Sequence, residues 1–352
     1  MRVYKIAFTG GPGGGKTDII NMVSEFLKGL KYNVIVNSET AREVIKSGIK
    51  PNPSDKKYTL WFQDAMIKFQ SLKEDTSEIY ANMLDKDVVI ILYDRTLLDN
   101  FAYLNNYKDY KYLFDKNNIK ELTESDKFDL VIDLSSLSNF DQFEYVNDEE
   151  RLEKKEESRL LDYKTSTSYL LSRNMKVIYP TKDIREKFKI VMNYISELLN
   201  QKSTKDIISY DVDFKNTDIS MYNEENSKEI LIKEYYLVNE LNNIEYILKR
   251  RSFKNEISYV LEKRCEGNII ESKVIDKIDA DFLLSKYKEI GSKVKVEINF
   301  MYDFKKYSLI LDDEYNGTLE IENSNFLTDI KIPKNIKLHN NLVKCKKCDS
   351  IY

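Results

Sequence analysis

The chain has little of several residue types on which common catalytic chemistries depend. Its 352 residues include one histidine, His339, and three cysteines, Cys265, Cys345 and Cys348. A single histidine excludes multi-histidine metal centres and makes any Ser-His-Asp or Cys-His chemistry depend on His339 alone. Three cysteines are too few for a disulfide framework, and Cys345 with Cys348 supplies at best half of a structural zinc site. These counts favour a reducing compartment, and we expect a cytoplasmic protein.

Long apolar runs and a charge of one sign are also lacking. No run of about 18 apolar residues occurs, so we expect no transmembrane helix, and the N-terminus shows no charged-then-apolar signal pattern. Lys and Arg number 55 against 59 Asp and Glu, for a net charge of -4. This balance excludes nucleic-acid binding by bulk charge, although a local basic groove stays possible.

The residues that are present suffice for two domains, with 42% hydrophobic residues to build their cores. In residues 1–202, apolar runs alternate with segments of helical spacing, at 17–30 and at 57–84, where Trp61, Ala65, Phe69 and Leu72 form one stripe. The expected strands are residues 3–8, 33–37, 87–93, 128–134 and 176–179. This alternation predicts an α/β domain, a doubly wound parallel sheet with helices on both faces.

The pattern changes after about residue 200. Residues 203–228 are polar and predict a linker, and residues 326–352 are a weakly patterned tail. Between them, residues 229–325 alternate with period two, apart from one expected helix at 279–290, and predict an antiparallel, β-barrel-like α+β domain. The expected strands are residues 229–238, 244–251, 256–265, 269–276, 293–302, 305–312 and 317–322.

Residues 10–17, Gly-Gly-Pro-Gly-Gly-Gly-Lys-Thr, match the Walker A string G-x-x-x-x-G-K-[ST] between an expected strand and an expected helix. Glycines let backbone N–H groups surround a phosphate, and the helix N-terminus adds positive potential. Lys16 should reach the β- and γ-phosphates of ATP or GTP, and the Thr17 hydroxyl should bind Mg²⁺. The predicted nucleotide-binding residues are Gly10, Gly11, Gly13, Gly14, Gly15, Lys16 and Thr17.

Polar residues follow the next two strands, at the carboxyl edge where open α/β sheets bind ligands. Asp94 is expected to hold Mg²⁺, or else to cap its strand, and no Glu follows it to activate water for ATP hydrolysis. Glu39 is predicted to be the base for an attacking hydroxyl or a substrate anchor, or simply to pair with Arg42. Arg42, Arg95 and Asp99 complete the candidate substrate-binding set.

Two further groups of charges have a plain and a functional interpretation. The charged segment 148–162 is either a solvated helix face or a lid whose Arg151 and Arg159 close over the transferred phosphoryl group. Charged residues on the later strands belong either to a sheet with one wet face or to a charged barrel interior that binds a phosphorylated anion. The predicted anion-site residues are Lys233, Lys249, Arg250, Lys263, Arg264, Lys273, Lys295, Glu297, Glu320 and Glu322.

The motifs of the first 200 residues resemble the P-loop domain shared by NadR-type nicotinamide-riboside kinases and TRPL-translocation-defect proteins. The resemblance rests on Thr-Gly-Gly-Pro-Gly-Gly-Gly-Lys-Thr (9–17), Glu-Thr-Ala-Arg (39–42) and Asp-Arg-Thr-Leu-Leu-Asp (94–99). It implies binding of ATP or GTP and of phosphorylated ligands, which include phosphoinositides in animal members.

Residues 244–322 resemble the CYTH-type triphosphate-tunnel domain that is attached to this P-loop domain in the TRPL-translocation-defect family. Lys-Arg-Arg (249–251), Ile-Ser-Tyr-Val-Leu-Glu-Lys-Arg (257–264) and Leu-Glu-Ile-Glu (319–322) carry that likeness. Tunnel triphosphatases carry Glu-x-Glu-x-Lys where this chain has Leu231 between Glu229 and Lys233. The resemblance therefore implies ligand binding without efficient hydrolysis.

Three functions stay open at this point. The first is a P-loop phosphotransferase that acts on a small, nucleoside-like hydroxyl acceptor. The second is a binding module whose second domain recognises a phosphorylated ligand according to the nucleotide held by the first. The third is triphosphatase activity in the second domain. The expected partners are a nucleoside triphosphate with Mg²⁺ and a small phosphorylated ligand or acceptor.

Overall fold

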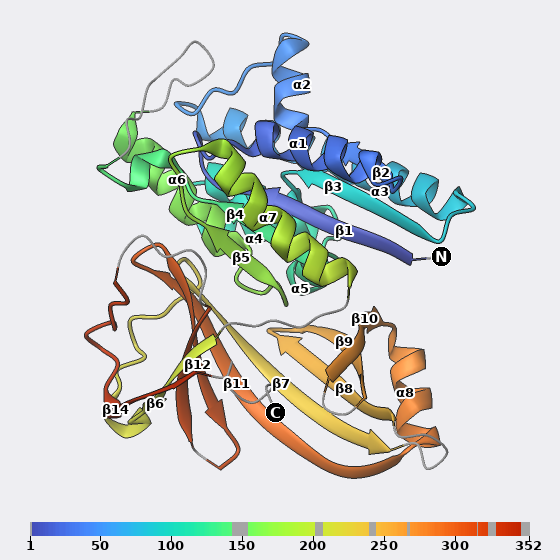
Figure 1. Cartoon of the computed structure of the whole chain (residues 1–352). Coiled ribbons are helices and arrows are strands. Elements are labelled where there is room, and N and C mark those ends of the chain that lie inside the picture. Colours follow the sequence, from blue (N-terminus) through green and yellow to red (C-terminus); the bar gives the residue numbers. More distant parts are fainter. Residues whose placement is uncertain are drawn as a thin grey trace. The chain divides into compact units, whose positions relative to one another are not determined.

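The computed structural model divides the chain into two compact units, Met1–Met192 and Asn193–Tyr352. Each unit is described by itself (Figure 1). The described residues are 2–142, 154–200, 207–238, 244–265, 268–314, 316–322 and 329–345.

The first unit is built on a five-stranded parallel sheet of order β2-β3-β1-β4-β5. Strands β3 and β4 are buried almost throughout, as expected for the middle of a parallel sheet. The register sets Phe8 beside Asp94 and Thr9 beside Asp133, so a carboxylate flanks β1 on both sides at its carboxyl end. The strands are β1 (Arg2–Thr9), β2 (Asn33–Asn37), β3 (Val88–Asp94), β4 (Leu130–Leu134) and β5 (Met175–Ile178).

Helices cover both faces of this sheet, which confirms the predicted α/β class. Helices α1 and α7 lie on the near face in Figure 1, where Phe26 and Phe188 pack edge to face at 5.7 Å. Helices α4 and α5 lie behind it, and α3 is tied to α4 through Asp64, which accepts a hydrogen bond from Asn117. The helices are α1 (Lys16–Gly29), α2 (Thr40–Lys46), α3 (Lys56–Met83), η1 (Leu97–Tyr103), α4 (Tyr107–Lys116), α5 (Glu121–Asp126), η2 (Leu137–Asn139), α6 (Lys155–Ser168) and α7 (Ile184–Leu199).

Helix α3 spans nearly the predicted residues, but its buried face is not the apolar stripe that the sequence shows. Trp61, Phe69 and Leu72 are 52%, 51% and 66% exposed, respectively. The buried side instead carries Phe62 and Met66, which pack against Val44 of α2, together with polar residues. Gln70 accepts a hydrogen bond from Thr40, and Glu74 pairs with Lys127. Because Gln70 and Glu74 bind partners inside the domain, the apolar stripe lies on the exposed side of α3.

The second unit is a nine-stranded antiparallel sheet of order β10-β9-β8-β7-β11-β12-β13-β6-β14. Helix α8 (Lys277–Lys286) packs on one face, where Ala280 meets Leu237 and Leu248. Among the described residues, β10 and β14 each pair on one side only, so the sheet is open and does not close into a barrel. The strands are β6 (Ile207–Val212), β7 (Ser227–Val238), β8 (Ile244–Phe253), β9 (Glu256–Cys265), β10 (Asn268–Ile275), β11 (Lys288–Tyr302), β12 (Lys305–Asp312), β13 (Gly317–Glu322) and β14 (Leu338–Cys345).

Three segments of this unit differ from the expectation. The polar stretch 203–228, expected to be a linker, contains β6 and the turn η3 (Phe214–Asn216). The weakly patterned tail contains β14, and β6 lies between β13 and β14. The helix expected at 279–290 ends at Lys286, because residues from Lys288 onward already pair with β7. In β6 the apolar alternation is only six residues long, and polar neighbours on both sides conceal it.

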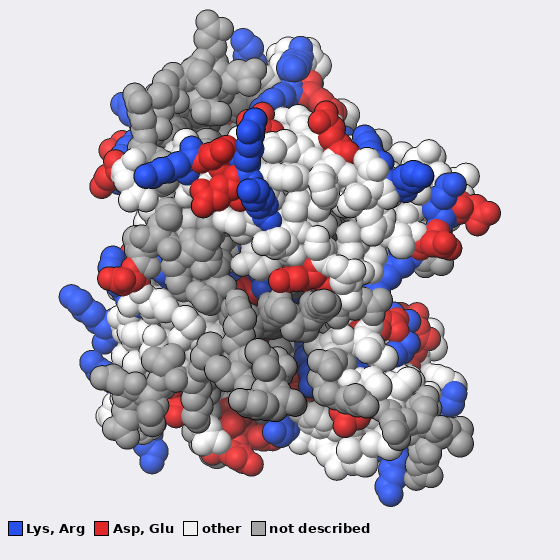
Figure 2. All heavy atoms as spheres, in the orientation of Figure 1, with Lys and Arg blue, Asp and Glu red and all other residues white. Residues whose placement is uncertain are grey.

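The face drawn in Figure 2 shows no single large charged patch, and the described residues contain no membrane-spanning helix. On the face drawn in Figure 2, basic and acidic side chains are interspersed. In the part of the chain that the structure describes, no helix is both long enough and apolar enough to cross a membrane.

Candidate functional site

The glycine-rich loop between β1 and α1 adopts a conformation that only glycine suits. Gly15, at the start of α1, has φ of 76° and Gly13 has φ of 77°, in the left-handed region that other residues rarely adopt. At Gly14, a Cβ atom would lie 2.3 Å from the carbonyl oxygen of Leu134. The end of β4 thus leaves no room for a side chain, and the loop lies close against the sheet.

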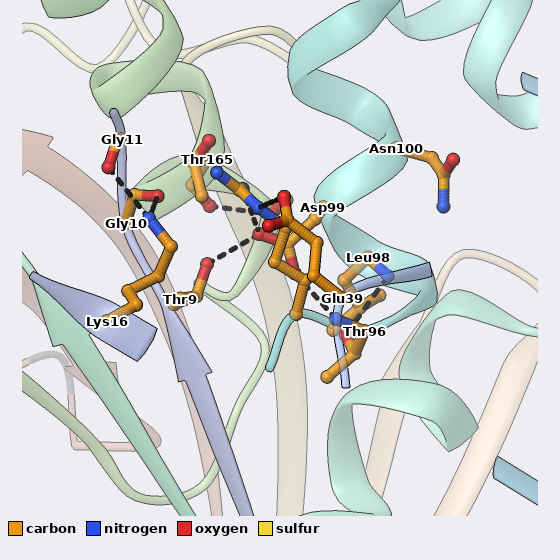
Figure 3. Close-up of polar contacts among 12 residues, drawn as sticks. Thr9, Gly10, Gly11, Lys16, Glu39, Thr96, Leu98, Asp99, Asn100 and Thr165 are labelled. Atoms are coloured by element: carbon orange, nitrogen blue, oxygen red, sulfur yellow. Dashed lines mark hydrogen bonds and ion pairs between the residues drawn. The ribbon is translucent and has the colours of Figure 1, made fainter. Parts of the chain in front are cut away.

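Lys16 folds back over this loop, as Figure 3 shows. Its Nζ donates hydrogen bonds to the carbonyl oxygens of Gly10 at 2.9 Å and Gly11 at 2.8 Å. Burial, with a contribution from the positive charge of Arg95, lowers the pKa of Lys16 to about 8. A buried ammonium bonded to the backbone of the glycine-rich loop is the arrangement of a Walker A motif, which holds a phosphate.

Thr17 and Asp94, the predicted Mg²⁺ ligands, lie side by side. The Thr17 hydroxyl donates to Asp94 Oδ2 at 3.3 Å. Asp94 Oδ1 is buried and has no hydrogen-bond partner among the described residues. Burial raises the pKa of Asp94, against the attraction of Lys16. A hydroxyl and an unsatisfied carboxylate oxygen beside a phosphate loop fit a hard divalent cation, so these two residues could hold Mg²⁺.

Arg95 links Glu39 of the β2–α2 turn to Asp99 of η1. Its Nε lies 3.1 Å from Glu39 Oε1 and its Nη1 3.1 Å from Asp99 Oδ1. Asp99 also accepts a hydrogen bond from Thr9 at 2.7 Å, from the last residue of β1 (Figure 3). Arg95 has φ of 69°, a conformation that costs about 1–3 kcal/mol in a residue with a side chain and recurs at functional sites. The strain is offset by two ion pairs.

Glu39 is the one carboxylate of this group that combines partial exposure with an ionised state. Its side chain is 21% exposed. Burial acts against its charge, but Arg95, Lys16 and Arg42 outweigh burial and lower the pKa of Glu39. Arg42 Nε lies 3.5 Å from Glu39 Oε2, as the alternative interpretation from the sequence expected. An ionised, reachable carboxylate near Lys16 can accept a proton from a hydroxyl group or bind one.

Of the two arginines predicted to form a lid, only Arg159 is among the described residues. Arg151 lies outside the described residues. Arg159 is on α6, where its Nε donates to the Ser138 carbonyl oxygen at 2.5 Å and its Nη2 lies 2.9 Å from Asp141. Arg159 thus binds the loop that follows β4.

Sequence reasoning missed Asp162, the side chain of α6 that reaches the phosphate loop. Asp162 is buried and accepts hydrogen bonds from the backbone N–H groups of Gly11 at 2.5 Å and Ser136 at 3.1 Å, and from the Asn139 amide at 2.5 Å. It is positioned to join α6, the loop after β4 and the phosphate loop. No motif marks it, because its partners are far away in the sequence.

Other residues at this end of the sheet were also missed. Tyr169 donates a 2.5 Å hydrogen bond to Asp99, and Lys187 of α7 donates one of 3.0 Å to the carbonyl oxygen of Gly14. Asp133 ends β4 beside Thr9, and burial together with the charge of Asp162 raises its pKa to about 8. Asp133 could have been found from its place at a strand end, whereas Tyr169 and Lys187 carry no sequence signal.

In the second unit, acidic and basic side chains alternate across four adjacent strands, β9, β8, β7 and β11. They form an unbroken chain of ion pairs with nitrogen–oxygen distances between 2.5 and 3.7 Å. In order, the pairs are Arg264–Glu262, Glu262–Lys249, Lys249–Glu234, Glu234–Lys295 and Lys295–Glu297. Arg251 lies on the same face, and burial lowers its pKa to about 10 despite nearby Glu297. We call this surface the ion-pair face.

The strand register divides the predicted anion-site residues between the two faces of the sheet, because directly opposed residues share a face. Glu320 lies opposite Ser308, which lies opposite Asn299, two residues from Glu297. Lys249, Arg264, Lys295, Glu297, Glu320 and Glu322 belong to the ion-pair face, whereas Lys233, Arg250, Lys263 and Lys273 lie on the other face. The sequence analysis grouped these ten residues as one candidate site, whereas the register places six on one face and four on the other, because alternation sends neighbouring charges to opposite sides.

The same register shows that Leu231 does not lie on the ion-pair face. Leu231 pairs with Val296 and is 41% exposed, on the face opposite to the ion pairs. The carboxylate that β7 contributes to the ion-pair face is Glu234, which the sequence analysis did not select. A missing ligand at Leu231 therefore says nothing about chemistry on the ion-pair face.

A parallel α/β sheet with a Walker A loop between its strand β1 and helix α1 defines a P-loop nucleotide-binding domain. The sequence of residues 5–187 matches the profile of a family described as AAA domain, over more than half of the chain, and the chain belongs to that family. No curated protein matches the chain.

The solved structures that are similar to part of the chain include the following two. One is the hypothetical protein NE1496, at 15% identity and a TM-score of 0.27, covering 38% of this chain and 88% of that one. The other is the PH1819 protein from Pyrococcus horikoshii OT3, at 14% identity and a TM-score of 0.25, covering 34% of this chain and 78% of that one. Scores this low carry no argument about fold or function.

Proposed function

We propose that the first unit transfers the γ-phosphoryl group of ATP or GTP to a small hydroxyl acceptor of nucleoside-like size. The observation that supports this most is the ionised Glu39 carboxylate, held by Arg95 at 3.1 Å and electrostatically coupled to Lys16. In motor-type ATPases an acidic residue that activates water follows the aspartate that corresponds to Asp94. That position holds Arg95, whose guanidinium is engaged by Glu39 and Asp99.

The residues then have distinct roles. The loop amides and Lys16 bind the phosphates, and Arg159, with Arg151, adds positive charge near the transferred group. Thr17 and Asp94 would hold Mg²⁺, which would neutralise phosphate charge. Glu39 accepts the proton of the attacking hydroxyl, while Arg42, Arg95 and Asp99 orient the acceptor. Positioning and charge stabilisation supply most of the catalysis in phosphoryl transfer.

The test is acceptor-dependent phosphorylation, followed by mass spectrometry with a panel of nucleosides and small alcohols, ATP or GTP and Mg²⁺. Glu39→Gln should lower kcat by roughly 10²–10⁴-fold while nucleotide affinity stays near the wild-type value. Glu43→Gln is the matched control, because Glu43 lies on α2, four residues after Glu39, but pairs with Lys73 at the surface. Tight nucleotide binding without any phosphorylated product would favour the nucleotide-gated binding module.

For the second unit, we propose that the ion-pair face binds a phosphorylated ligand, in keeping with the resemblance to CYTH-type domains. A phosphate group can replace the carboxylates that now neutralise Lys249 and Lys295, and the released carboxylates can hold a divalent cation. Because Leu231 lies on the other face, the sequence-based argument against hydrolysis no longer applies. Triphosphatase activity is therefore a second candidate function of this face.

A further inference from the structure

Helix α3 carries an exposed apolar stripe that the phosphotransferase site does not use. Phe69, Leu72, Ile79 and Met83 are 51%, 66%, 62% and 77% exposed. With Thr76 between Leu72 and Ile79, they follow one another at alternating spacings of three and four residues. That alternation is the seam pattern of two helices that pack against each other along their length.

The fold of the first unit gives this stripe no partner helix among the described residues, since α3 packs into its own domain with another face. The buried side chains along its length include Ile67, Gln70, Glu74 and Ala81. Contiguous apolar surface of this kind is rare on monomers and marks interaction sites. The seam therefore faces outward, and it is suited to a second helix.

We propose that α3 pairs with α3 of a second copy of this chain, antiparallel and about a two-fold axis, with Phe69 against the partner's Leu72. An isologous contact of this kind uses the same stripe twice. Met83 of each copy then lies beside the Tyr58–Trp61 pair of the other, whose rings are 5.2 Å apart. Methionine sulfur packs favourably at aromatic ring edges.

Several registers would bring the two stripes together, and charge complementarity favours the proposed one. Lys68 and Asp75 are exposed and lie on the same flank of the seam, each one residue before a seam position. In the proposed register Lys68 faces the partner's Asp75, and symmetry repeats the pair. A shift of one heptad in one direction sets Asp75 against the partner's Asp75, and in the other direction Lys68 against the partner's Lys68. Parallel pairing would set Lys68 against the partner's Lys73.

The size of the stripe predicts a specific but moderate association. Trp61, Phe69, Leu72, Ile79, Tyr80 and Met83 are each more than half exposed. If each contributes about 100 Å², the pair buries about 1,200 Å², at the lower end of specific interfaces. The dimer should therefore form in the micromolar range rather than be obligate.

The test is sedimentation equilibrium of the full chain over roughly 1–200 μM, with melting curves to establish folding. The wild type should be a reversible dimer, and Leu72→Glu should raise its dissociation constant at least about tenfold while the variant still melts cooperatively. Leu30→Glu is the control, because Leu30 is an equally exposed apolar residue away from α3, at 56%.

A charge exchange tests the register itself. Lys68→Asp alone and Asp75→Lys alone should each weaken the dimer, and the double variant should restore association. A protein that stays monomeric at every concentration would overturn the proposal, whatever the reason that α3 is not available. So would a dimer indifferent to Leu72→Glu, and failure of the double variant to restore association would overturn the register.

Discussion

Glu124 is a carboxyl group buried in the first unit among charges of its own sign. Glu74, Glu78 and Glu124 all pair with Lys127, whose Nζ lies 2.6, 3.1 and 3.6 Å from them, respectively, and Glu78 also pairs with Lys5. Burial, reinforced by Glu74, raises the pKa of Glu124 to about 8. A protonated Glu124 is therefore part of the stable folded state near neutral pH.

This shift predicts how stability depends on pH. A raised folded-state pKa adds stability that is fully present below the unfolded value, about 4.5, and is lost as pH rises through about 8. Groups with lowered pKa, such as Asp64 and Glu78, titrate below that window. We expect the melting temperature of the nucleotide-free protein to fall between pH 5.5 and 8.5.

In Glu124→Gln this fall should be smaller by at least about 3 °C. The measurement is thermal unfolding followed by circular dichroism at both pH values. Glu25→Gln, on the exposed surface of α1, should keep the wild-type dependence. An unchanged dependence in Glu124→Gln would show that Glu124 is ionised in the folded state.

Single residues differ in how well sequence predicts them. Gly10 to Thr17 were predicted because the phosphate loop is one contiguous string whose geometry is local. Glu39, Asp94 and Arg95 could be selected because parallel strands bring their carboxyl ends to one edge. Asp162 and Tyr169 could not, since each acts through a tertiary contact that no spacing encodes.

At the scale of elements, period-two alternation located most strands of the second unit but not their pairing. Alternation shows which residues share a face within one strand, whereas register decides which faces combine. For that reason Arg250 was grouped with Lys295, although of these two neighbours it is Arg251 that lies on the ion-pair face. Strand β6 was missed altogether, because its stability comes from β13 and β14 rather than from its own pattern.

Strand β6 should be essential to the second unit. A fragment of residues 201–352 keeps β6, whereas 226–352 removes it and takes Val212 out of a core shared with Leu319 and Ile321. We predict that the longer fragment melts cooperatively and that the shorter one aggregates, because β13 would present an unpaired edge. Calorimetry of both fragments is the measurement. Residues 1–202, the predicted first domain, should melt cooperatively by themselves, and a cooperative melt of 226–352 would contradict the role of β6.

At the scale of the whole molecule, the two proposed sites should be separable by mutation. Lys16→Ala should remove phosphate binding by the P-loop. In that background we expect Lys249→Ala with Lys295→Ala to weaken tripolyphosphate binding at least about tenfold. Lys263→Ala removes a similar charge from the opposite face, where Lys263 pairs with Glu271, and should have no effect. Isothermal calorimetry with and without Mg²⁺ provides the measurement.

Two results would change this view of the second unit. Release of phosphate from tripolyphosphate with Mg²⁺ in the Lys16→Ala background would show that the ion-pair face is a triphosphatase site. No binding by the folded protein would leave the ion pairs as an ordinary wet face of a sheet. In either case ATP or GTP binding by the first unit should be the same in Lys249→Ala and in the wild type.

The position of β6 between β13 and β14 also affects how the second unit folds during translation. Strand β6 is made first among the nine strands, yet its neighbours β13 and β14 are made last. The first unit can complete its parallel sheet during synthesis, while β6 has no partner until the six strands β7 to β12 have been made and β13 follows. Throughout that interval its backbone edges are unpaired, and pairing of such distant segments is slow. Nascent chains should therefore depend on chaperones at this stage, and ribosome-bound chains that stop short of β14 should bind them longest.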